Sequence, residues 1–474
     1  MKKKINHILP ALVLTASLGL TTVSCNGFLD EMPDNRTELN TDQKIAKLLV
    51  SAYADVSPNE LFELYSDNSD DSGPTYGYYK LSEQECYHWQ DTKEEYQDTP
   101  NSLWGGYYSA IAAANMALNA IEEKGNPASL DPQRGEALVC RAYCHFMLAN
   151  IFCNAYDTHA SQSLGVPYME EVETTVSPRY ERGTLEEVYR KVERDLLEGI
   201  GLISDDSYSV PKYHFTRKAA YAFAARFYLY YMKPDFSNCD RVIDFATRVL
   251  GTNPADLLRN WEALGNLSVN GNVQADAYIA SSNEANLLIS STISNWGAIG
   301  SDYLIGPRYF HNQTLATSET CLSSGLWGSS DYFYLKPFST NGFVASILRK
   351  SGLYEGTYLY YMPVLFSTDE TLLCRAEAYA LKKMYSQSAA DITSWQRAYT
   401  RNKSVLTPEQ INASLPPPPA ASPQRWSFPC WQPFSSSPRK NVDKYPQGVY
   451  NATMKLYPRE VFAWTAAAIR QSTA

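Results

Sequence analysis

The sequence predicts a mainly α-helical protein, in which helical pairs form a scaffold and long aromatic-rich loop insertions separate them. Two observations carry this prediction. Apolar residues recur at helical spacing in separate blocks, and the segments between the blocks are long, polar and rich in aromatic residues. The helical blocks cover residues 41–53, 102–123, 131–154, 184–202, 216–232, 240–250 and 368–384.

Several blocks begin at a residue type that caps helices. Thr41, Thr184 and Thr216 stand at block starts, and Thr184 is followed by Glu187 at the spacing of a capping box. Small residues at close spacing, as in the alanines of residues 110–117, let neighbouring helices approach closely. We therefore expect antiparallel helix pairs that stack on one another.

The N-terminus has the pattern of a secretory signal peptide, with Lys2 to Lys4 followed by the apolar residues 8–20. Cys25 follows where a bacterial lipoprotein is cleaved, so we expect removal of residues 1–24 and a lipid on Cys25. The apolar stretch is too short for a spanning helix, which needs about 20 apolar residues. The alternative is an ordinary secreted protein, because Thr22 stands where a lipobox more often has leucine.

The chain is acidic, with 41 basic and 51 acidic residues among 474 and a formal charge of -10. Loss of residues 1–24, which hold three lysines and no acid, changes the charge to -13. Nucleic acids and anionic lipid headgroups are poor partners for such a chain, since both favour clustered Lys and Arg. The 35 tyrosines favour binding surfaces that are partly exposed to solvent, because each tyrosine offers an apolar ring and one hydroxyl.

Cysteines and histidines give no sign of a cofactor. Cys140 and Cys144 lie one helical turn apart in an apolar segment, so we expect most cysteines to be small buried residues. The sequence has no CxxC pair, and its six histidines are scattered singly, which disfavours a metal site. We expect no metal and no cofactor.

Three long insertions separate the helical blocks, at residues 57–101, 155–183 and 251–367. The first and third combine aromatic rings with short polar side chains. That composition suits a neutral polyhydroxylated ligand, whose C–H faces stack on rings while its hydroxyls bond to amides and carboxylates. Most of these aromatics are expected to pack the insertions onto the helices, and a subset to line a site. The candidate ligand contacts are Tyr76, Tyr78, Trp89, Asn295, Trp296, Tyr309, Asn312 and Trp327.

The sequence contains none of the motifs GxSxG, HExxH, GxxxxGK[ST] or GxGxxG. Paired carboxylates such as Glu136 and Glu377 lie inside helical, core-facing patterns. We expect these two to bond between helices, with Arg141 and Arg375 as nearby partners. No catalytic residue is predicted.

Short motifs follow one another in order behind Cys25. They are Phe28-Leu29-Asp30 and Pro33; Trp104, Tyr108, Ile111, Asn115, Leu118 and Ile121; Gly135-Glu136-Ala137 with Arg141-Ala142-Tyr143; Gly165-Val166-Pro167; Arg182-Gly183-Thr184 with Val188-Tyr189 and Asp195-Leu196; Thr216 to Ala220 with Ala225-Arg226 and Tyr228-Leu229-Tyr230; and Asp369-Glu370 with Leu373, Arg375 and Ala376-Glu377-Ala378. Each motif is weak alone. In this order they resemble the SusD-like (SusD/RagB) family of surface lipoproteins.

The resemblance implies a tetratricopeptide-like scaffold whose long insertions form the ligand-binding face. It also implies an outer-membrane lipoprotein of a Gram-negative bacterium, facing the cell exterior, that captures oligosaccharide and delivers it to a SusC-like TonB-dependent transporter. The implied layout is a signal peptide at 1–24, a lipid-anchored tether at 25–40 and a single domain at 41–474. Within that domain, residues 41–251 and 368–390 form the helical scaffold, and the insertion 252–367 forms part of the binding face.

Motif residues such as Trp104, Asn115, Glu136 and Arg141 are expected to hold the scaffold, because they lie on predicted helices. Two other functions stay open. One is a transporter lid that binds peptide or no ligand itself. The other is a surface glycoside hydrolase, which would release reducing ends from the polymer that it binds.

The C-terminal residues depart from the family pattern. The proline run at 416–419 is expected to be extended, and residues 420–437 to be loop. The family continues with acidic, glycine, arginine and Phe-Asp elements after its Arg-Glu pair, whereas here an alanine-rich run follows Phe462. A shifted reading frame or a truncation near Phe462 is our hypothesis for this difference.

Overall fold

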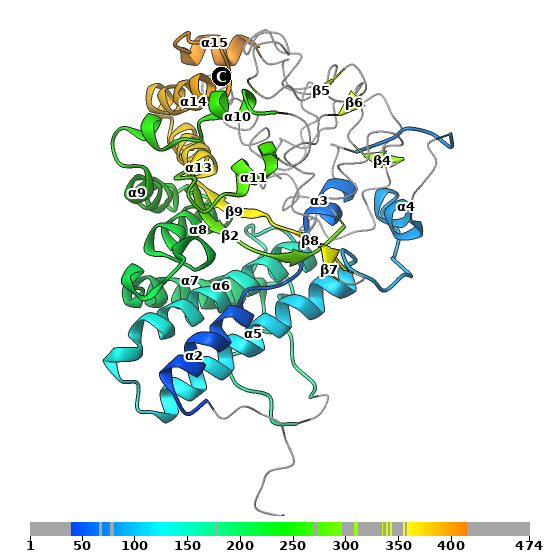
Figure 1. Cartoon of the computed structure of the whole chain (residues 1–474), viewed down its shortest axis with the longest axis vertical. Coiled ribbons are helices and arrows are strands. Elements are labelled where there is room, and N and C mark those ends of the chain that lie inside the picture. Colours follow the sequence, from blue (N-terminus) through cyan, green and yellow to red (C-terminus); the bar gives the residue numbers. More distant parts are fainter. Residues whose placement is uncertain are drawn as a thin grey trace, which may run out of the picture. The chain divides into compact units, whose positions relative to one another are not determined.

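Pairs of long α-helices follow one another in a stack and form the scaffold of this computed structural model (Figure 1). The structure describes residues 39–65, 69–75, 80–175, 178–268, 273–295, 308–310, 334, 338–339, 342–343, 354–355 and 358–414. All elements named here belong to the unit Thr41–Ala474. The scaffold helices are α2 (Asp42–Leu48), α5 (Pro100–Glu123), α6 (Asp131–Phe152), α7 (Leu185–Leu202), α8 (Arg217–Tyr230), α9 (Cys239–Leu250), α13 (Thr368–Leu381) and α14 (Tyr385–Tyr399).

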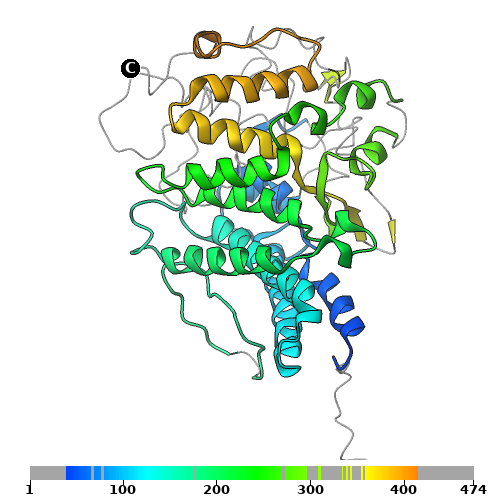
Figure 2. The same cartoon turned by 90° about the vertical axis from the view of Figure 1, so that its left-hand side faces the viewer.

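The scaffold helices pack against their sequence neighbours. Helix α6 packs between α5 and α7, α8 packs on α9, and α13 packs on both α9 and α14. Figure 2 shows these helices lying one above another. The predicted mainly helical architecture is therefore confirmed.

The three threonines predicted to start helices are all N-caps. Thr41 Oγ1 accepts from Lys44 N–H at 3.3 Å, and Thr216 Oγ1 accepts from Ala219 N–H at 3.2 Å. Thr184 forms the full capping box with Glu187, because each side chain accepts from the other residue's backbone N–H. The caps satisfy backbone donors that have no partner inside the helix, which fixes where each helix begins.

An aromatic core joins the helices to a strand that follows them in the chain. Tyr143 of α6 lies edge-on to Phe223 of α8, with ring centroids 5.4 Å apart. Phe366 of β9 (Val364–Ser367) packs 5.7 Å from Tyr143 and 5.8 Å from Phe223. Such rings bury large apolar areas and favour these edge and tilted contacts. The contacts fix the end of the third insertion on the scaffold.

Short helices and strands occupy parts of the predicted loop insertions. The strands pair in antiparallel fashion and are only two to four residues long, too short for an alternating apolar pattern to reveal them. The pairs are β1 (Asp70–Asp71) with β4 (Tyr309–Phe310), β2 (Asn286–Ile289) with β9, β8 (Tyr358–Tyr361) with both β3 (Thr292–Ile293) and β7 (Tyr354–Glu355), and β5 (Phe338–Ser339) with β6 (Gly342–Phe343). The shorter helices are α3 (Asn59–Tyr65), α4 (Leu81–Tyr87), α10 (Trp261–Gly265), α11 (Val273–Ile279) and α15 (Pro408–Ser414), with 3-10 turns at Leu49–Ala52, Ala128–Leu130, Asp205–Ser207, Pro211–Tyr213 and Pro254–Leu257.

Helix α14 is an element that the apolar pattern does not predict. Its sequence is rich in Ser and Ala, and its buried side chains include Ile392 and Trp395. The cysteine prediction is confirmed for the six described thiols, all of which are buried. Among the described helices, none combines the length and the apolar character that crossing a membrane requires.

Candidate binding face

Two insertions far apart in the sequence meet beside the helical scaffold. Strand β1 of the first insertion pairs with β4 of the third, with Asp70 opposite Phe310 and Asp71 opposite Tyr309. Helices α3 and α4 pack against each other and against β4 (Figure 1). The corner formed by β1, β4, α3 and α4 is the candidate binding face.

A bidentate ion pair joins the two insertions at this corner. Arg308 Nε lies 2.6 Å from Asp71 Oδ1, and Arg308 Nη2 lies 2.8 Å from Asp71 Oδ2. Gly73 N–H also donates to Asp71 Oδ1 at 2.8 Å. The hydrogen bonds from Arg308 hold the pKa of the Asp71 carboxyl below its usual range. The pair is partly exposed, so a ligand hydroxyl can reach both an acceptor and a donor there.

Three rings form an aromatic cluster next to the ion pair. Tyr87 stacks on Tyr309 with centroids 4.7 Å apart, and His88 lies edge-on to Tyr87 at 5.2 Å and to Tyr309 at 5.8 Å. His88 is exposed, Tyr87 is half-buried and Tyr309 is buried. The end of α4 at Tyr87 places His88 outside the helix, where its ring can face solvent.

An exposed ring beside a carboxylate and a guanidinium can bind a sugar by complementary contacts. The ring face packs against C–H groups, and the charged pair bonds to hydroxyls. Within the described residues, no three His, Cys, Asp or Glu side chains are grouped as a metal site.

Three of the predicted ligand contacts lie in the described part of the chain. Trp89 is buried with its ring edge-on to Tyr65 at 5.1 Å, and Tyr309 is the buried member of the aromatic cluster. Asn295 Oδ1 accepts from Gln97 Nε2 at 2.8 Å, which joins the two insertions a second time. Both rings are therefore packing residues, and Tyr309 packs on Tyr87 of the first insertion. Outside the described residues lie Tyr76, Tyr78, Trp296, Asn312 and Trp327, as does Cys25.

Sequence reasoning missed Asp71, His88 and Arg308. Asp71 and Arg308 are 237 positions apart, and no spacing in the sequence relates them. The available signals were the polar residues flanking predicted aromatics, since His88 precedes Trp89 and Arg308 precedes Tyr309.

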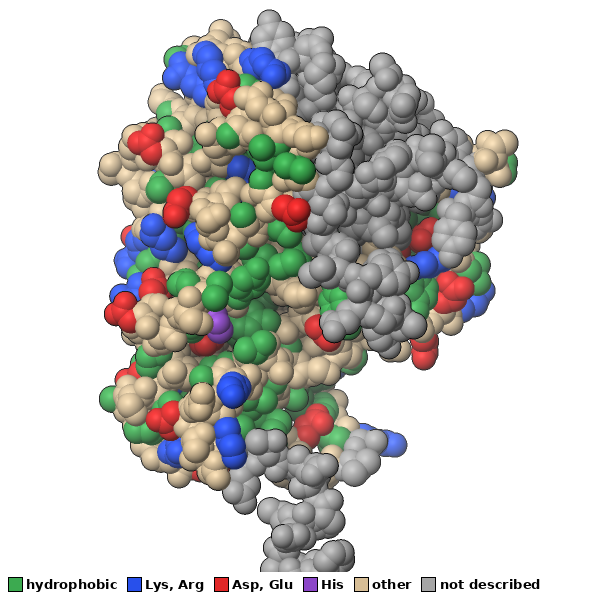
Figure 3. Space-filling model, viewed as in Figure 1, with side chains coloured by type: hydrophobic (Ala, Val, Ile, Leu, Met, Phe, Trp, Pro, Cys, Tyr) green, Lys and Arg blue, Asp and Glu red, His purple; other side chains and the backbone are tan. Residues whose placement is uncertain are grey.

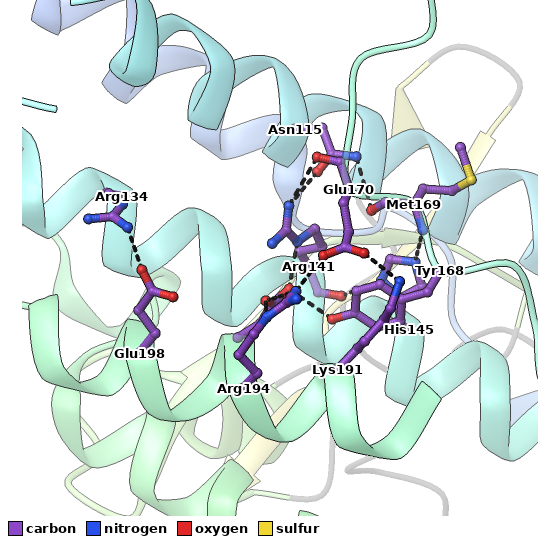
Figure 4. A network of polar contacts seen from close by, with 11 residues as sticks. Asn115, Arg134, Arg141, His145, Tyr168, Met169, Glu170, Lys191, Arg194 and Glu198 are labelled. Atoms are coloured by element: carbon purple, nitrogen blue, oxygen red, sulfur yellow. Dashed lines mark hydrogen bonds and ion pairs between the residues drawn. The ribbon is translucent and has the colours of Figure 1, made fainter. Parts of the chain in front are cut away.

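A second polar cluster, on the scaffold, explains several motif residues (Figure 4). Arg141 Nη1 donates to Asn115 Oδ1 at 3.0 Å and to the Glu170 carbonyl at 3.3 Å. Asn115 Nδ2 donates to the Met169 carbonyl at 3.1 Å. These bonds hold residues 168–171, here named the strap, across α5 and α6. The motif residues Asn115 and Arg141 therefore hold the scaffold, as predicted.

Asp195 of α7 completes the cluster from below the strap. Its carboxylate accepts from Arg141 Nε at 2.6 Å, from Tyr168 OH at 2.8 Å and from Arg194 Nη2 at 2.6 Å. The Arg141 and Asp195 side chains are 7% and 1% exposed. Buried charges persist only when paired and hydrogen-bonded in this way, so the cluster fixes the relative positions of α6, α7 and the strap.

His145 is buried beneath the strap as a neutral ring. Its Nε2 accepts from Met169 N–H at 2.9 Å, and its Nδ1 lies 2.9 Å from the Arg141 carbonyl, so the proton is assigned to Nδ1. Tyr168 stacks on the ring with centroids 3.8 Å apart. Burial lowers the pKa of His145 to about 3.

We expect the stability of the protein to fall on the acid side partly through His145. Between pH 3 and pH 6.5 the unfolded chain binds a proton here that the native state does not, so stability rises with pH across this window. The contribution has a slope of up to about 1.4 kcal/mol per pH unit. The variant His145→Gln keeps an acceptor for Met169 N–H and is expected to flatten the curve.

Urea unfolding from pH 4 to pH 7 measures this effect. His159→Gln is the matched control, because His159 is 64% exposed. Equal pH slopes for the wild type and His145→Gln would show that His145 does not contribute.

The predicted pairing of Glu136 with Arg141 is wrong. Glu136 Oε1 accepts from Tyr53 OH at 2.6 Å and lies 2.7 Å from His214 Nδ1. Glu136 and Arg141 are five positions apart, which on a helix turns their side chains about 140° from each other. Glu136 still bonds between elements, as expected, but with different partners.

Arg375 also has a different partner from the predicted one. Its Nε and Nη2 each lie 2.8 Å from the carboxylate oxygens of Asp391, on the unpredicted helix α14. Arg226, another motif residue, forms a bidentate pair with Glu370 of α13. These pairs join α8 to α13 and α13 to α14, so they serve the scaffold and not the candidate binding face.

Acidic and basic side chains are interspersed over the described helices in Figure 3. On this face, the described residues form no extended patch of a single charge sign.

A family model supports the resemblance seen in the motifs. Residues 27–229 match a SusD-like family described as starch-binding and associating with the outer membrane. Over these residues the chain is similar to the SusD-like family. The matched region contains the motifs from Phe28 to Leu229, including the SusD-like scaffold residues Asn115 and Arg141. Among curated proteins, no relative matches the sequence.

Solved structures share the SusD-like fold. A SusD superfamily protein from Bacteroides fragilis is 15% identical, with a TM-score of 0.60 and coverage of 91% of this chain and 90% of that one. A proposed sugar-binding protein from Bacteroides vulgatus is 21% identical, with a TM-score of 0.58 and coverage of 80% and 83%. A surface glycan-binding protein from Bacteroides uniformis is 14% identical, with a TM-score of 0.55 and coverage of 79% and 84%. At these identities the likeness concerns the fold.

Proposed function

We propose that this SusD-like protein binds neutral oligosaccharides at the candidate binding face and does not hydrolyse them. One observation carries the proposal. The exposed ring of His88 and the half-buried ring of Tyr87 lie beside the Asp71–Arg308 pair, on a corner that both aromatic-rich insertions build. The family match and the sugar-binding neighbours of the same fold support it.

Binding at such a partly exposed face is expected to be modest. Dissociation constants from micromolar to millimolar correspond to about -8 to -4 kcal/mol. Weak capture suits a protein that passes its ligand on. We propose delivery to a SusC-like TonB-dependent transporter, with the protein held on the outer membrane, facing the exterior, by a lipid on Cys25 in the predicted layout.

The wider ligand site includes residues that stay predictions. Tyr76, Tyr78, Trp296, Asn312 and Trp327 belong to the two insertions that meet at this corner, and we propose that some of them extend the ring surface. Trp89 and Tyr309 support that surface from beneath. Asn295 remains a proposed ligand contact.

Replacing His88 by alanine is expected to weaken oligosaccharide binding about tenfold, which is about 1.4 kcal/mol. Asp71→Asn is expected to weaken it as well, because the change removes the charge that holds Arg308 in place. Isothermal titration calorimetry of the chain from Asn26 onward, against a panel of neutral oligosaccharides, measures both effects. His159→Ala is the matched control, since His159 is an exposed histidine of the second insertion.

Four outcomes would contradict the proposal. New reducing ends in the titrated samples would favour the hydrolase. Heat from a peptide digest but from no sugar would favour peptide cargo. A transporter complex that forms while no ligand binds would favour a structural lid. Unchanged affinity in His88→Ala, with saturable sugar binding in the wild type, would place the site elsewhere.

A further inference from the structure

A buried cluster of acids lies beneath the candidate binding face, where α3, the loop before α5 and the end of β3 meet. Glu60 of α3 is 4% exposed and Asp98 is 5% exposed, and their side chains are hydrogen-bonded to each other. Two carboxyl groups bond directly only when they share a proton. The contact therefore requires one proton on the pair.

Asp98 connects this pair to the third insertion. Its Oδ2 accepts from Asn295 N–H at 2.7 Å, and Ser294 also bonds to its side chain. Asp98 has a left-handed backbone with φ 71°, which a non-glycine residue keeps only when its surroundings hold it. The Asp98 side chain thus fixes both a strained turn and the junction between the two insertions.

The surroundings of the pair favour a bound proton. Glu60 faces Asp98 and Tyr96 from the loop before α5, and Lys80, Glu83 and Cys86 from α4 and its N-cap. Lys80 Nζ lies 4.0 Å from the Tyr96 ring centroid and is the one cation among the acids Glu60, Glu83 and Asp98 in this set.

Within the described residues, no donor from outside the pair reaches Glu60 Oε2 or Asp98 Oδ1. Lys80 Nζ has no acceptor there either, so the Lys80 ammonium does not bond to the pair. Burial raises the pKa of Glu60 well above its usual value, and the Asp98 charge and hydrogen bond raise it further. An ionised Glu60 would be a second buried negative charge in contact with the first.

We propose that the Glu60–Asp98 pair is a proton-dependent latch that holds the first and third insertions together beneath the candidate binding face. With the proton bound, Glu60 donates to Asp98, and Asp98 accepts from Asn295. When the proton leaves at higher pH, two buried carboxylates repel each other and the junction loosens. Only the consequence for ligand affinity rests on the proposed function. The latch itself is a property of the apo protein.

The sign of the pH effect follows from proton binding. Between the ordinary pKa of a glutamate and the raised pKa of Glu60, the native state binds one proton more than the open state. Closure of the latch therefore weakens as pH rises, by up to about tenfold per pH unit for one proton. This direction is opposite to that of His145, whose contribution to stability grows as pH rises.

Two measurements on the purified protein without ligand test the latch. Infrared spectroscopy of the wild type at pH 7 is expected to show a buried protonated carboxyl, and Glu60→Gln is expected to lack it. Hydrogen exchange of the Asn295 amide, corrected for its intrinsic rate, is expected to lose protection from pH 6 to pH 9 in the wild type. Protection in Glu60→Gln is expected to stay constant, since the amide donates to Asp98 without needing a proton.

The matched control is Glu95→Gln, because Glu95 is an exposed glutamate in the same loop and should behave like the wild type. Absence of a protonated carboxyl at pH 7, or equal pH dependence of Asn295 protection in Glu60→Gln and the wild type, would overturn the proposal. If Glu60→Gln does not fold, the wild type and Glu95→Gln still test the proposal. Both must then show the infrared band of a protonated carboxyl at pH 7 and a loss of Asn295 protection as pH rises. Loss of sugar binding alone would count against the proposed function and not against the latch.

Discussion

Replacing Arg141 by methionine is expected to lower the free energy of unfolding by about 3–5 kcal/mol. The change keeps most of the side-chain volume but removes the cation that bonds to Asp195 at 2.6 Å and to Asn115 at 3.0 Å. Asp195 is 1% exposed, so its charge would stay buried with fewer partners. Breaking one side of a buried ion pair is far more destabilising than losing an exposed one.

Arg134→Met is the matched control for this prediction. Arg134 lies on the same helix and pairs with Glu198 of the same partner helix, but the two side chains are 33% and 41% exposed. Its loss is expected to cost about 0–1 kcal/mol. Urea unfolding at pH 7 measures both variants. Equal effects of the two substitutions would mean that burial of the Arg141 pair does not matter.

Hydrogen exchange adds a local test of the same cluster. Arg141 also bonds to the Glu170 carbonyl, so Arg141→Met should release the strap at residues 168–171. The Met169 amide, which donates to His145 Nε2, is expected to lose protection before the rest of the protein unfolds. Retained protection of Met169 in Arg141→Met would show that His145 and Asn115 hold the strap without the cation.

The helices could be predicted from the sequence because their signals are local. Thr184 and Glu187 are three positions apart, and the capping box that they form needs only the first turn of α7. Partner choice between helices is not local. Arg141 has acidic residues nearby in sequence, yet it pairs with Asp195, 54 positions away, because the packing of α6 on α7 brings the two together.

For the candidate binding face, the sequence could predict which two insertions contribute to it but not which residues meet there. Aromatic and polar composition identified the first and third insertions, and the structure brings these two together through β1 and β4. Strands of two residues carry no readable pattern, so the contact of Asp71 with Arg308 had no signal. Composition also does not tell a supporting ring from an exposed one, which is why buried Trp89 was predicted and exposed His88 was not.

Replacing Gly135 by valine is expected to lower the free energy of unfolding by about 3 kcal/mol. Gly135 of α6 is buried where α6 crosses α7, and a Cβ there would lie 2.8 Å from both Gly199 O and Ile203 N. Both contacts are with backbone atoms, which cannot turn aside as a side chain can. The helices would have to separate, and the Arg141–Asp195 pair further along the same interface would lengthen with them.

Gly105→Ala is the control, since Gly105 lies in α5 with nothing within 4 Å of an added Cβ. It is expected to raise stability by about 0.5–1 kcal/mol, because alanine is the better helix former. A Cβ at Gly199 would lie 2.7 Å from Gly135 O, so Gly135→Ala and Gly199→Ala act on one contact. Once either alanine has forced the helices apart, the second meets less resistance, and the double variant is expected to cost less than the sum of the single ones. If urea unfolding shows strictly additive losses of stability, Gly135 and Gly199 permit two separate close contacts between α6 and α7. If Gly135→Ala instead stabilises the protein, the two helices can move apart without loss of stability.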